Sequence, residues 1–234
     1  MNWMAKTRPA GAVPASAAPG KPTPGPVASG AANGNSRVSN GLKEFLWLIG
    51  DVPRGRVLDL GPIYQSTLNF FVEKGYRVSS EDILRAWKDF LTAEEERLRT
   101  APVGDGWDKL SPSALAAKFL ENALQYQAES FHGVLAWDLF DYFDPEAAPR
   151  IVERLSSLVH PGGAVLALFH SRPAERFHRY RIIDKQNVEL VPASTIAVHA
   201  RVFQNRELLD LFSSFRSSKS FVGRDQVREA LFVK

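Results

Sequence analysis

Arg56-Val57-Leu58-Asp59-Leu60-Gly61 is a short apolar run that ends in an acid and a glycine. Such a run is typical of a buried parallel strand that leads into a turn. Residues 66–75 follow, with apolar side chains at helical spacing and Ser66 as the predicted N-cap. Residues 76–82 then indicate a second strand with an acidic end. Residues 56–82 are therefore predicted to form one β-α-β unit.

The same alternation extends on both sides of this unit. Upstream, apolar residues at helical spacing predict a helix that Asn40 caps and Gly50 ends. Downstream, the sequence predicts a helix at 83–91 that is followed by a charged stretch, then a Gly-containing loop and a helix starting at Ser111-Pro112. A short strand at 123–126, a strand at 131–137, a helix at 149–159, a break at 160–163 and a strand at 164–169 come next. The last predicted elements are a hairpin of 180–183 with 188–191, a helix from about Asn205, and strands at 218–222 and 228–233. Alternating strands and helices predict an α/β fold with a doubly wound, mostly parallel sheet.

Composition limits the chemistry of the chain. It has 234 residues, of which 24% are charged and 44% hydrophobic, enough for one domain with a full core. The absence of Cys excludes disulfides, thiolate zinc sites and Cys nucleophiles. Metal sites built only from His and carboxylates stay open, but no His-x-x-x-His pair occurs, so the sequence assigns no metal ligands. The sequence has no apolar run of spanning length and no secretory signal at its start, so we expect a cytoplasmic protein without a membrane partner.

Residues 1–40 differ in composition from the rest. They contain nine Ala, six Pro and five Gly, with four basic residues and no acid. We expect them to form a disordered tail, followed by one domain over 41–234. The domain has 25 basic and 26 acidic residues, which does not favour nucleic-acid binding. A protein partner that docks on the basic tail is the alternative to a solvated leader.

With these elements in place, residues 42–234 resemble the class I S-adenosylmethionine (SAM)-dependent methyltransferases, most closely the bacterial small-molecule type. The features that carry the resemblance are Val57 to Gly61, the acidic pair Glu81-Asp82, the strand ending at Asp138, the Pro161-Gly162-Gly163 turn before a strand, and the closing antiparallel pair. The resemblance implies a Rossmann-like, doubly wound, seven-stranded sheet, mostly parallel with a C-terminal antiparallel hairpin. It also implies SAM as cofactor.

Several residues become candidates for holding that cofactor. Gly61 permits a tight turn and close approach to a ligand, and Asp82, with Glu81 as its competitor, has the spacing of a ribose carboxylate. The resemblance adds Asp59, which would orient the loop, and Asn122, which would contact the adenine. Pro62 and Trp137 complete the predicted cofactor set. The alternatives are a strand-end turn carboxylate for Asp59, an acid that faces solvent without a ligand for the Glu81-Asp82 pair, and a solvated helix end for Asn122.

The cofactor loop departs from the family pattern. The family has Gly-x-Gly-x-Gly after the acid, whereas this chain has Gly61-Pro62-Ile63-Tyr64-Gln65. Pro62 removes a backbone donor, and the β-branched Ile63 resists a positive φ. The sequence therefore leaves two main hypotheses, a methyltransferase acting on a small molecule and an inactive methyltransferase-like scaffold. An NAD-dependent oxidoreductase fits less well, because the Gly-rich fingerprint is missing.

Methyl transfer requires alignment of the reactants, and a base only where the acceptor must lose a proton. Asp138 after the fourth strand and His170 after the fifth are the predicted catalytic residues. The alternatives are a turn cap for Asp138 and a strand-end residue for His170. The cluster His178-Arg179-Tyr180-Arg181 is predicted to cover the site or meet an anionic acceptor, with a solvated hairpin edge as the alternative.

Overall fold

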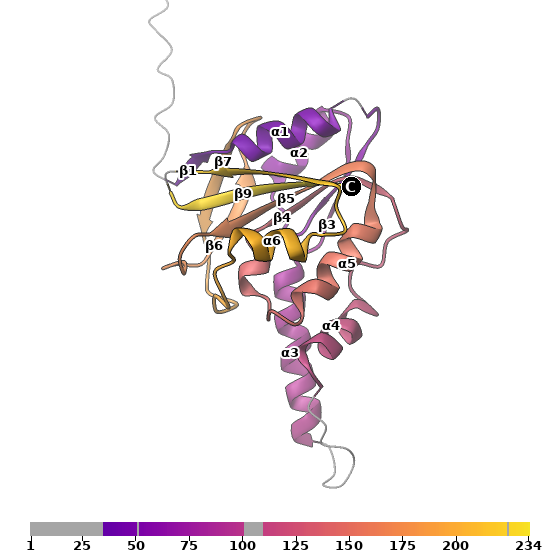
Figure 1. Ribbon diagram of the computed structural model, residues 1–234, viewed down its shortest axis with the longest axis vertical. Helices are drawn as coiled ribbons and strands as arrows, with labels where there is room; N and C mark the ends of the chain where they lie inside the picture. The colour runs from indigo at the N-terminus through magenta and orange to yellow at the C-terminus, as the bar shows by residue number, and fades with distance from the viewer. Residues whose placement is uncertain (1–34, 51, 101–109, 224) are drawn as a thin grey trace, which may run out of the picture. The chain divides into compact units, whose positions relative to one another are not determined.

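The computed structural model describes residues 35–50, 52–100, 110–223 and 225–234, which alternate strands and helices (Figure 1). Their elements are β1 (Ser36–Val38), α1 (Asn40–Ile49), β2 (Arg56–Asp59), α2 (Gln65–Glu73), β3 (Arg77–Ser80), α3 (Ile83–Thr100), α4 (Pro112–Leu120), β4 (Phe131–Trp137), the 3-10 helix η1 (Leu139–Tyr142), α5 (Ala148–Leu158), β5 (Val159–His170), β6 (His178–Ile182), β7 (Asn187–Pro192), α6 (Asn205–Leu211), β8 (Ser217–Val222) and β9 (Val227–Val233).

The main sheet has six strands in the order β3-β2-β4-β5-β9-β8 among the described residues. The first four strands of this order are parallel, while β9 lies antiparallel between β5 and β8. The chain runs from β2 to β3 on one side and then returns to β4 on the other side of β2. The direction of winding therefore reverses between β2 and β4, and open α/β sheets bind ligands outside the carboxyl ends of strands at such a point.

The short strand expected at residues 123–126 is absent from this described segment. Leu124 has φ of 56°, which a strand does not accept. Its N–H donates to Glu81 Oε1 (3.0 Å), and its carbonyl accepts from Arg154 Nη2 (2.7 Å). Side chains thus take up the backbone groups that a strand would pair, and the prediction of a strand here is wrong.

A second, three-stranded sheet has the order β1-β7-β6 with antiparallel pairing. The predicted hairpin is confirmed by the pairing of β6 with β7. β1 lies inside the segment that the sequence analysis assigns to the tail, so regular structure begins before residue 41. The rest of the predicted tail, residues 1–34, and the Gly-containing loop at 101–109 lie outside the described residues.

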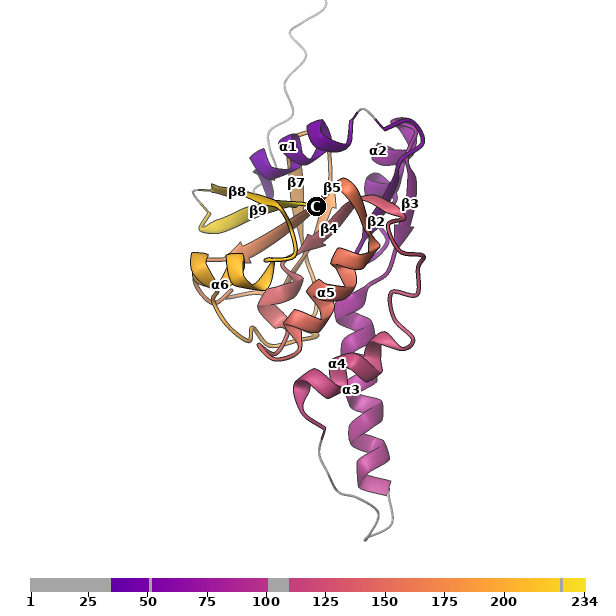
Figure 2. The ribbon, with the colours of Figure 1, turned by 45° about the vertical axis from the view of Figure 1, so that its right-hand side comes forward.

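Helices cover both faces of the main sheet (Figure 2). One core lies beneath α1 and α2 and also takes side chains from the small sheet, among them Tyr180, Ile182 and Val188. The other core lies beneath α3 to α6 and is rich in Phe. Through Tyr180 the small sheet approaches the carboxyl ends of the parallel strands, because the Tyr180 hydroxyl reaches Asp138, the residue that follows β4.

The helix starts show which caps form. Ser111 caps α4 as predicted, its hydroxyl accepting from Ala114 N (3.2 Å), with Pro112 as the first helical residue. Ser39, not Asn40, caps α1, since its hydroxyl accepts from Leu42 N (2.9 Å). Likewise α2 begins at Gln65, so Ser66 lies inside the helix and does not cap it.

Two further boundaries differ from those predicted. β5 begins at Val159, directly after α5, so residues 160–163 belong to the strand and Gly162 supplies a positive φ of 83° within it. α3 is one helix of 18 residues that includes the charged stretch.

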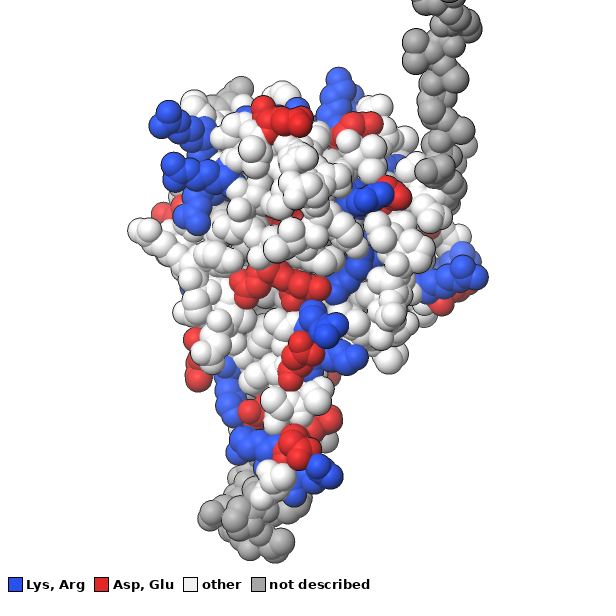
Figure 3. Space-filling view, turned by 180° about the vertical axis from the view of Figure 1, so that it is seen from behind, with Lys and Arg blue, Asp and Glu red and all other residues white. Residues whose placement is uncertain are grey.

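The surface carries charges of both signs. The face seen from behind has basic and acidic side chains intermixed, also along the projecting helix α3 (Figure 3). Several of the charges on α3 form local ion pairs, such as Arg99 with Glu96 (2.8 Å). No helix among the described residues is long and apolar enough to cross a membrane.

Candidate functional site at the strand ends

A buried acid organises the turn after β2. Asp59 is 3% exposed, and its Oδ1 accepts from Gly61 N (3.0 Å) and from Trp137 Nε1 (2.7 Å). Burial raises the pKa of Asp59 to about 6, although both hydrogen bonds oppose this rise. Asp59 therefore holds the turn and the indole together from the end of its strand.

Trp137 fills the space over this turn. A Cβ added at Gly61 would lie 3.1 Å from two atoms of the indole ring, so the two residues are in close contact. Trp137 has φ of 47°, an unusual left-handed conformation at the end of β4. Its ring stacks on Tyr180 with centroids 5.6 Å apart and planes at 9°. The turn is therefore closed by an aromatic pair.

The acid Asp82 is engaged by the small sheet. Arg179 Nη2 lies 2.9 and 2.8 Å from its two carboxylate oxygens, and both side chains are largely buried. Asp82 Oδ1 also accepts from Arg85 N (3.2 Å) in the first turn of α3. The predicted ribose carboxylate thus has a cationic partner from a segment 97 residues away.

Its competitor Glu81 is engaged as well. Glu81 Oε1 accepts from Leu124 N, and Glu81 N donates to Asp59 O (2.9 Å), continuing the ladder between β2 and β3. Ser80 Oγ donates to Gly61 O (3.1 Å). Both acids at the end of β3 therefore lie near the turn, with their side chains directed at different partners.

A small cavity remains between these groups. Its volume is about 10 Å³, close to the space of a single water. Its lining includes four of the predicted site residues, namely Gly61, Pro62, Trp137 and Asp138, together with Arg179 and Tyr180. The structure thus brings these four together, with Asp59 and Asp82 in contact with the lining.

Two predicted residues lie elsewhere. Asn122 is exposed in the turn after α4 and does not line the cavity. His170 lies at the end of β5 and lines a different cavity, of about 220 Å³, beside the segment 172–176.

Asp138 belongs to a buried polar network. It is 6% exposed, and its Oδ2 accepts from the Tyr180 hydroxyl (3.2 Å). Burial, reinforced by the charge of Asp141, raises the pKa of Asp138 to about 6. Burial also raises the pKa of the Tyr142 hydroxyl, with the charges of both acids adding to it. Asp138 therefore accepts a hydrogen bond in an apolar setting rather than capping a helix with its side chain.

His170 pairs with a second buried acid. Its Nδ1 and its backbone N both lie 2.8 Å from Asp141 Oδ2, and Asp141 is fully buried. Burial lowers the pKa of His170, but the bond to Asp141 and the charges of Asp138 and Asp141 outweigh it and raise that pKa above its usual value.

His199, whose Nε2 lies 3.6 Å from Asp141 Oδ2, carries no signal in the sequence. His199 stands in an irregular segment between β7 and α6, where periodicity gives no signal. The pairing of Arg179 with Asp82 was not predicted either, although the cluster at 178–181 was singled out as a cover for the site.

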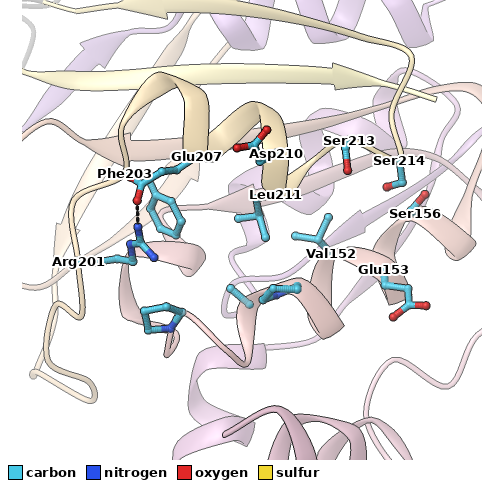
Figure 4. A pocket seen from close by; sticks show the side chains of 13 residues that line it. Val152, Glu153, Ser156, Arg201, Phe203, Glu207, Asp210, Leu211, Ser213 and Ser214 are labelled. Carbon is cyan, nitrogen blue, oxygen red and sulfur yellow. Dashed lines mark hydrogen bonds and ion pairs between the residues drawn. The ribbon is translucent and has the colours of Figure 1, made fainter.

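A further cavity lies apart from these residues. It measures about 560 Å³ and lies between α5 and α6 (Figure 4). Val152 and Leu211 face it from the two helices, and Arg201 pairs with Glu207 at one end. None of the predicted site residues lines it.

No profile of a known protein family matches the sequence, and no curated protein matches it. The chain is similar to several solved structures. One of them is 1,6-didemethyltoxoflavin-N1-methyltransferase from Burkholderia thailandensis, bound to S-adenosylhomocysteine (SAH). The two sequences are 17% identical, the match covers 83% of this chain and 76% of that chain, and the TM-score is 0.43. A SAM-dependent methyltransferase from Methanosarcina mazei is 14% identical over 78% and 93% of the two chains, with a TM-score of 0.40. The glycopeptide N-methyltransferase MtfA in complex with SAM is 18% identical over 84% and 94%, with a TM-score of 0.40.

All three are methyltransferases, the class that the sequence resembles. The α/β architecture of the described residues is the one that this resemblance implies, with six strands in place of seven. At these identities and TM-scores, the likeness does not determine what this chain binds or does.

Proposed function

We propose that the chain is a SAM-dependent methyltransferase that acts on a small-molecule acceptor. The observation that carries the proposal is the arrangement at the switch point, where Asp59 and Gly61 end one strand and Glu81 and Asp82 end its neighbour. Carboxylates there can accept hydrogen bonds from ribose hydroxyls and from an ammonium group. In the proposal Asp82 receives the ribose, and Asp59 keeps the turn in place.

The hydrogen-bonding groups at the strand ends suit SAM, but the cavity beside Gly61 is too small to hold it. A cavity of about 10 Å³ cannot hold a nucleoside, so Trp137, Arg179 and Tyr180 would have to move. No step of the reaction is therefore assigned through the cofactor. The proposal requires that Arg179 releases Asp82, which would let β6 act as a cover that opens on binding.

Of the two predicted catalytic residues, Asp138 is the better placed for a general base. It lines the cavity beside Gly61, whereas His170 is bonded to Asp141 and lines another cavity. In the proposal Asp138 accepts the proton of an acceptor that must lose one, after Tyr180, which donates to it in the closed arrangement, has moved.

A second function is favoured by a specific observation, the close packing of Trp137 on Gly61. In this second function the packing excludes the cofactor, and the chain is a methyltransferase-like scaffold that does not bind it. The docking partner would then be a protein, and the basic segment 1–40 is the candidate for contacting it.

Calorimetric titration of the full chain with SAM and SAH tests both proposals. We expect micromolar binding, tighter in Arg179→Ala because the competitor for Asp82 is gone, and weaker in Asp82→Asn. Arg181→Ala is the matched control, since Arg181 lies on the same strand and pairs with Glu189 (2.7 Å) instead. Absence of heat in the native chain and in Arg179→Ala, with both folded, would overturn the proposal and favour the scaffold.

A further inference from the structure

Asp141, His170 and His199 converge on one point from three separate parts of the chain. Asp141 lies in η1, His170 ends β5, and His199 lies in the irregular segment before α6. One ligand-type atom from each residue lies within 4.8 Å of the other two. Asp141 Oδ2 is 2.8 Å from His170 Nδ1 and 3.6 Å from His199 Nε2.

The cluster contains polar atoms that the described residues leave unsatisfied. His199 Nε2 and Asp141 Oδ1 are buried and have no hydrogen-bond partner within the part of the chain that the structure describes. The side chain of His199 is 8% exposed and that of Asp141 is not exposed at all. Burying such atoms without a partner is costly, so both point to a group that the chain alone does not supply.

The three side chains are also held in place. Ala200 N donates to Asp141 O (2.7 Å), which ties the segment carrying His199 to η1. His170 N donates to the carboxylate of Asp141. The His199 ring packs edge-on against Tyr142, with centroids 5.7 Å apart. Preorganised ligands of this kind lower the cost of binding an ion.

We propose that Asp141, His170 and His199 bind a divalent transition-metal ion, with Zn²⁺ as the expected occupant. Two imidazole nitrogens and one carboxylate oxygen are a donor set that suits such ions. Bonds of about 2.0–2.2 Å around a tetrahedral ion place neighbouring ligand atoms roughly 3.3–3.6 Å apart. The two separations from Asp141 Oδ2, 2.8 and 3.6 Å, lie close to this spacing, and all three ligand atoms lie within 4.8 Å of one another.

Three protein ligands leave at least one coordination position for water or a substrate atom. His170 lines the cavity of about 220 Å³, whose wall carries Arg172 and Arg176 as well as the acids Glu175 and Asp225. The open position would therefore be reached from a cavity with charges of both signs. This inference does not depend on SAM binding, because the cluster and the Gly61 cavity have different linings.

The alternative for the cluster is a protonated His170 paired with Asp141 and no ion. Two titrations of the chelator-treated full chain distinguish these alternatives. Binding of Co²⁺ is measured by visible absorption, and binding of Zn²⁺ is measured by calorimetry. We expect one ion per chain and a Co²⁺ spectrum of nitrogen and oxygen ligation. His199→Gln and His170→Gln should each weaken binding by at least about 10-fold, the loss that removing even an outer-shell partner of a ligand causes.

His160→Ala is the matched control. His160 stacks on His132, with ring centroids 5.1 Å apart, near the starts of β5 and β4 and so at the other end of the sheet from His170. These two residues form the other close pair of imidazoles among the described residues. Binding should be unchanged in this variant. Absence of stoichiometric binding to the native chain, or binding that His160→Ala weakens and His199→Gln does not, would overturn the proposal. Circular dichroism confirms that each variant is folded, and Asp141→Asn adds a third ligand test.

Discussion

Asp59 combines two roles whose energies oppose each other. As a carboxylate it accepts two hydrogen bonds that hold the turn and Trp137, and as a buried charge it destabilises the folded chain. Both donors reach the same atom, Oδ1, so an amide oxygen at this position can accept both. The residue therefore keeps a negative charge that the local structure does not require, which is expected where a ligand uses the charge.

The first prediction concerns the pH dependence of this residue. The pKa of Asp59 is raised from 3.8 to about 6, so the folded chain retains a proton that the unfolded chain has already lost. Stability must then fall as the pH rises through this window, relative to Asp59→Asn, which has no such proton. Between pH 4 and 7 the free energy of unfolding of the native chain, relative to that of Asp59→Asn, should fall by up to about 3 kcal/mol. Urea unfolding of both proteins between pH 4 and 8 measures this difference, and parallel stability curves would contradict it.

The helices and strands that the sequence predicted correctly are those whose own residues carry the apolar spacing and the capping residues of the element. The buried run at 56–61, the helix at Ser111-Pro112 and the closing pair of strands all carry their own signals in spacing and caps. The predicted strand at 123–126 failed because Glu81 and Arg154, both distant in sequence, bind the backbone of Leu124. Such contacts leave no trace in a local pattern.

The cap of α1 gives a prediction at the scale of one element. Ser39 is buried and its hydroxyl accepts from Leu42 N, whereas Asn40 is exposed and already helical. Ser39→Ala should lower the free energy of unfolding by about 1 kcal/mol, the usual value of an N-cap. Asn40→Ala should leave it nearly unchanged. Thermal unfolding of the two variants checks this, and a larger loss in Asn40→Ala would show that the cap is misassigned.

At the scale of the whole molecule, the site depends on contacts between segments far apart in sequence. The sequence predicted which residues end the parallel strands, because each strand carries its own signal. It could not predict that Arg179 would meet Asp82 or that His199 would meet Asp141, since these pairs depend on where the small sheet and an irregular segment fold back. The strand ends and the covering segment 178–181 were therefore predictable, and the individual pairs that form there were not.

The small sheet also ties the start of the described chain to its end. Arg37 in β1 is 7% exposed and lies 2.6 Å from Asp225 and 3.0 Å from Glu229 of β9, whose side chain is 2% exposed. Gly41 N donates to the same Glu229 carboxylate. Removing one partner of a buried ion pair leaves the other charge uncompensated, which costs about 3–5 kcal/mol.

The last prediction follows from this pair and places the boundary of the domain. The sequence places the boundary at residue 40, so a chain of residues 41–234 would keep the whole domain. The structure predicts instead that residues 35–234 retain full stability, while 41–234 lose β1 and Arg37 and become less stable by about 3–5 kcal/mol. Urea unfolding of the full chain and both truncations measures the difference.

Adding Glu229→Gln to 41–234 should restore part of that stability, because it removes the uncompensated charge and keeps an acceptor for Gly41 N. Equal stability of the two truncations would contradict the prediction and return the boundary to residue 40. A loss in 41–234 that Glu229→Gln does not reduce would assign the effect to the other contacts that the truncation removes, the pairing of β1 with β7 and the Ser39 cap of α1.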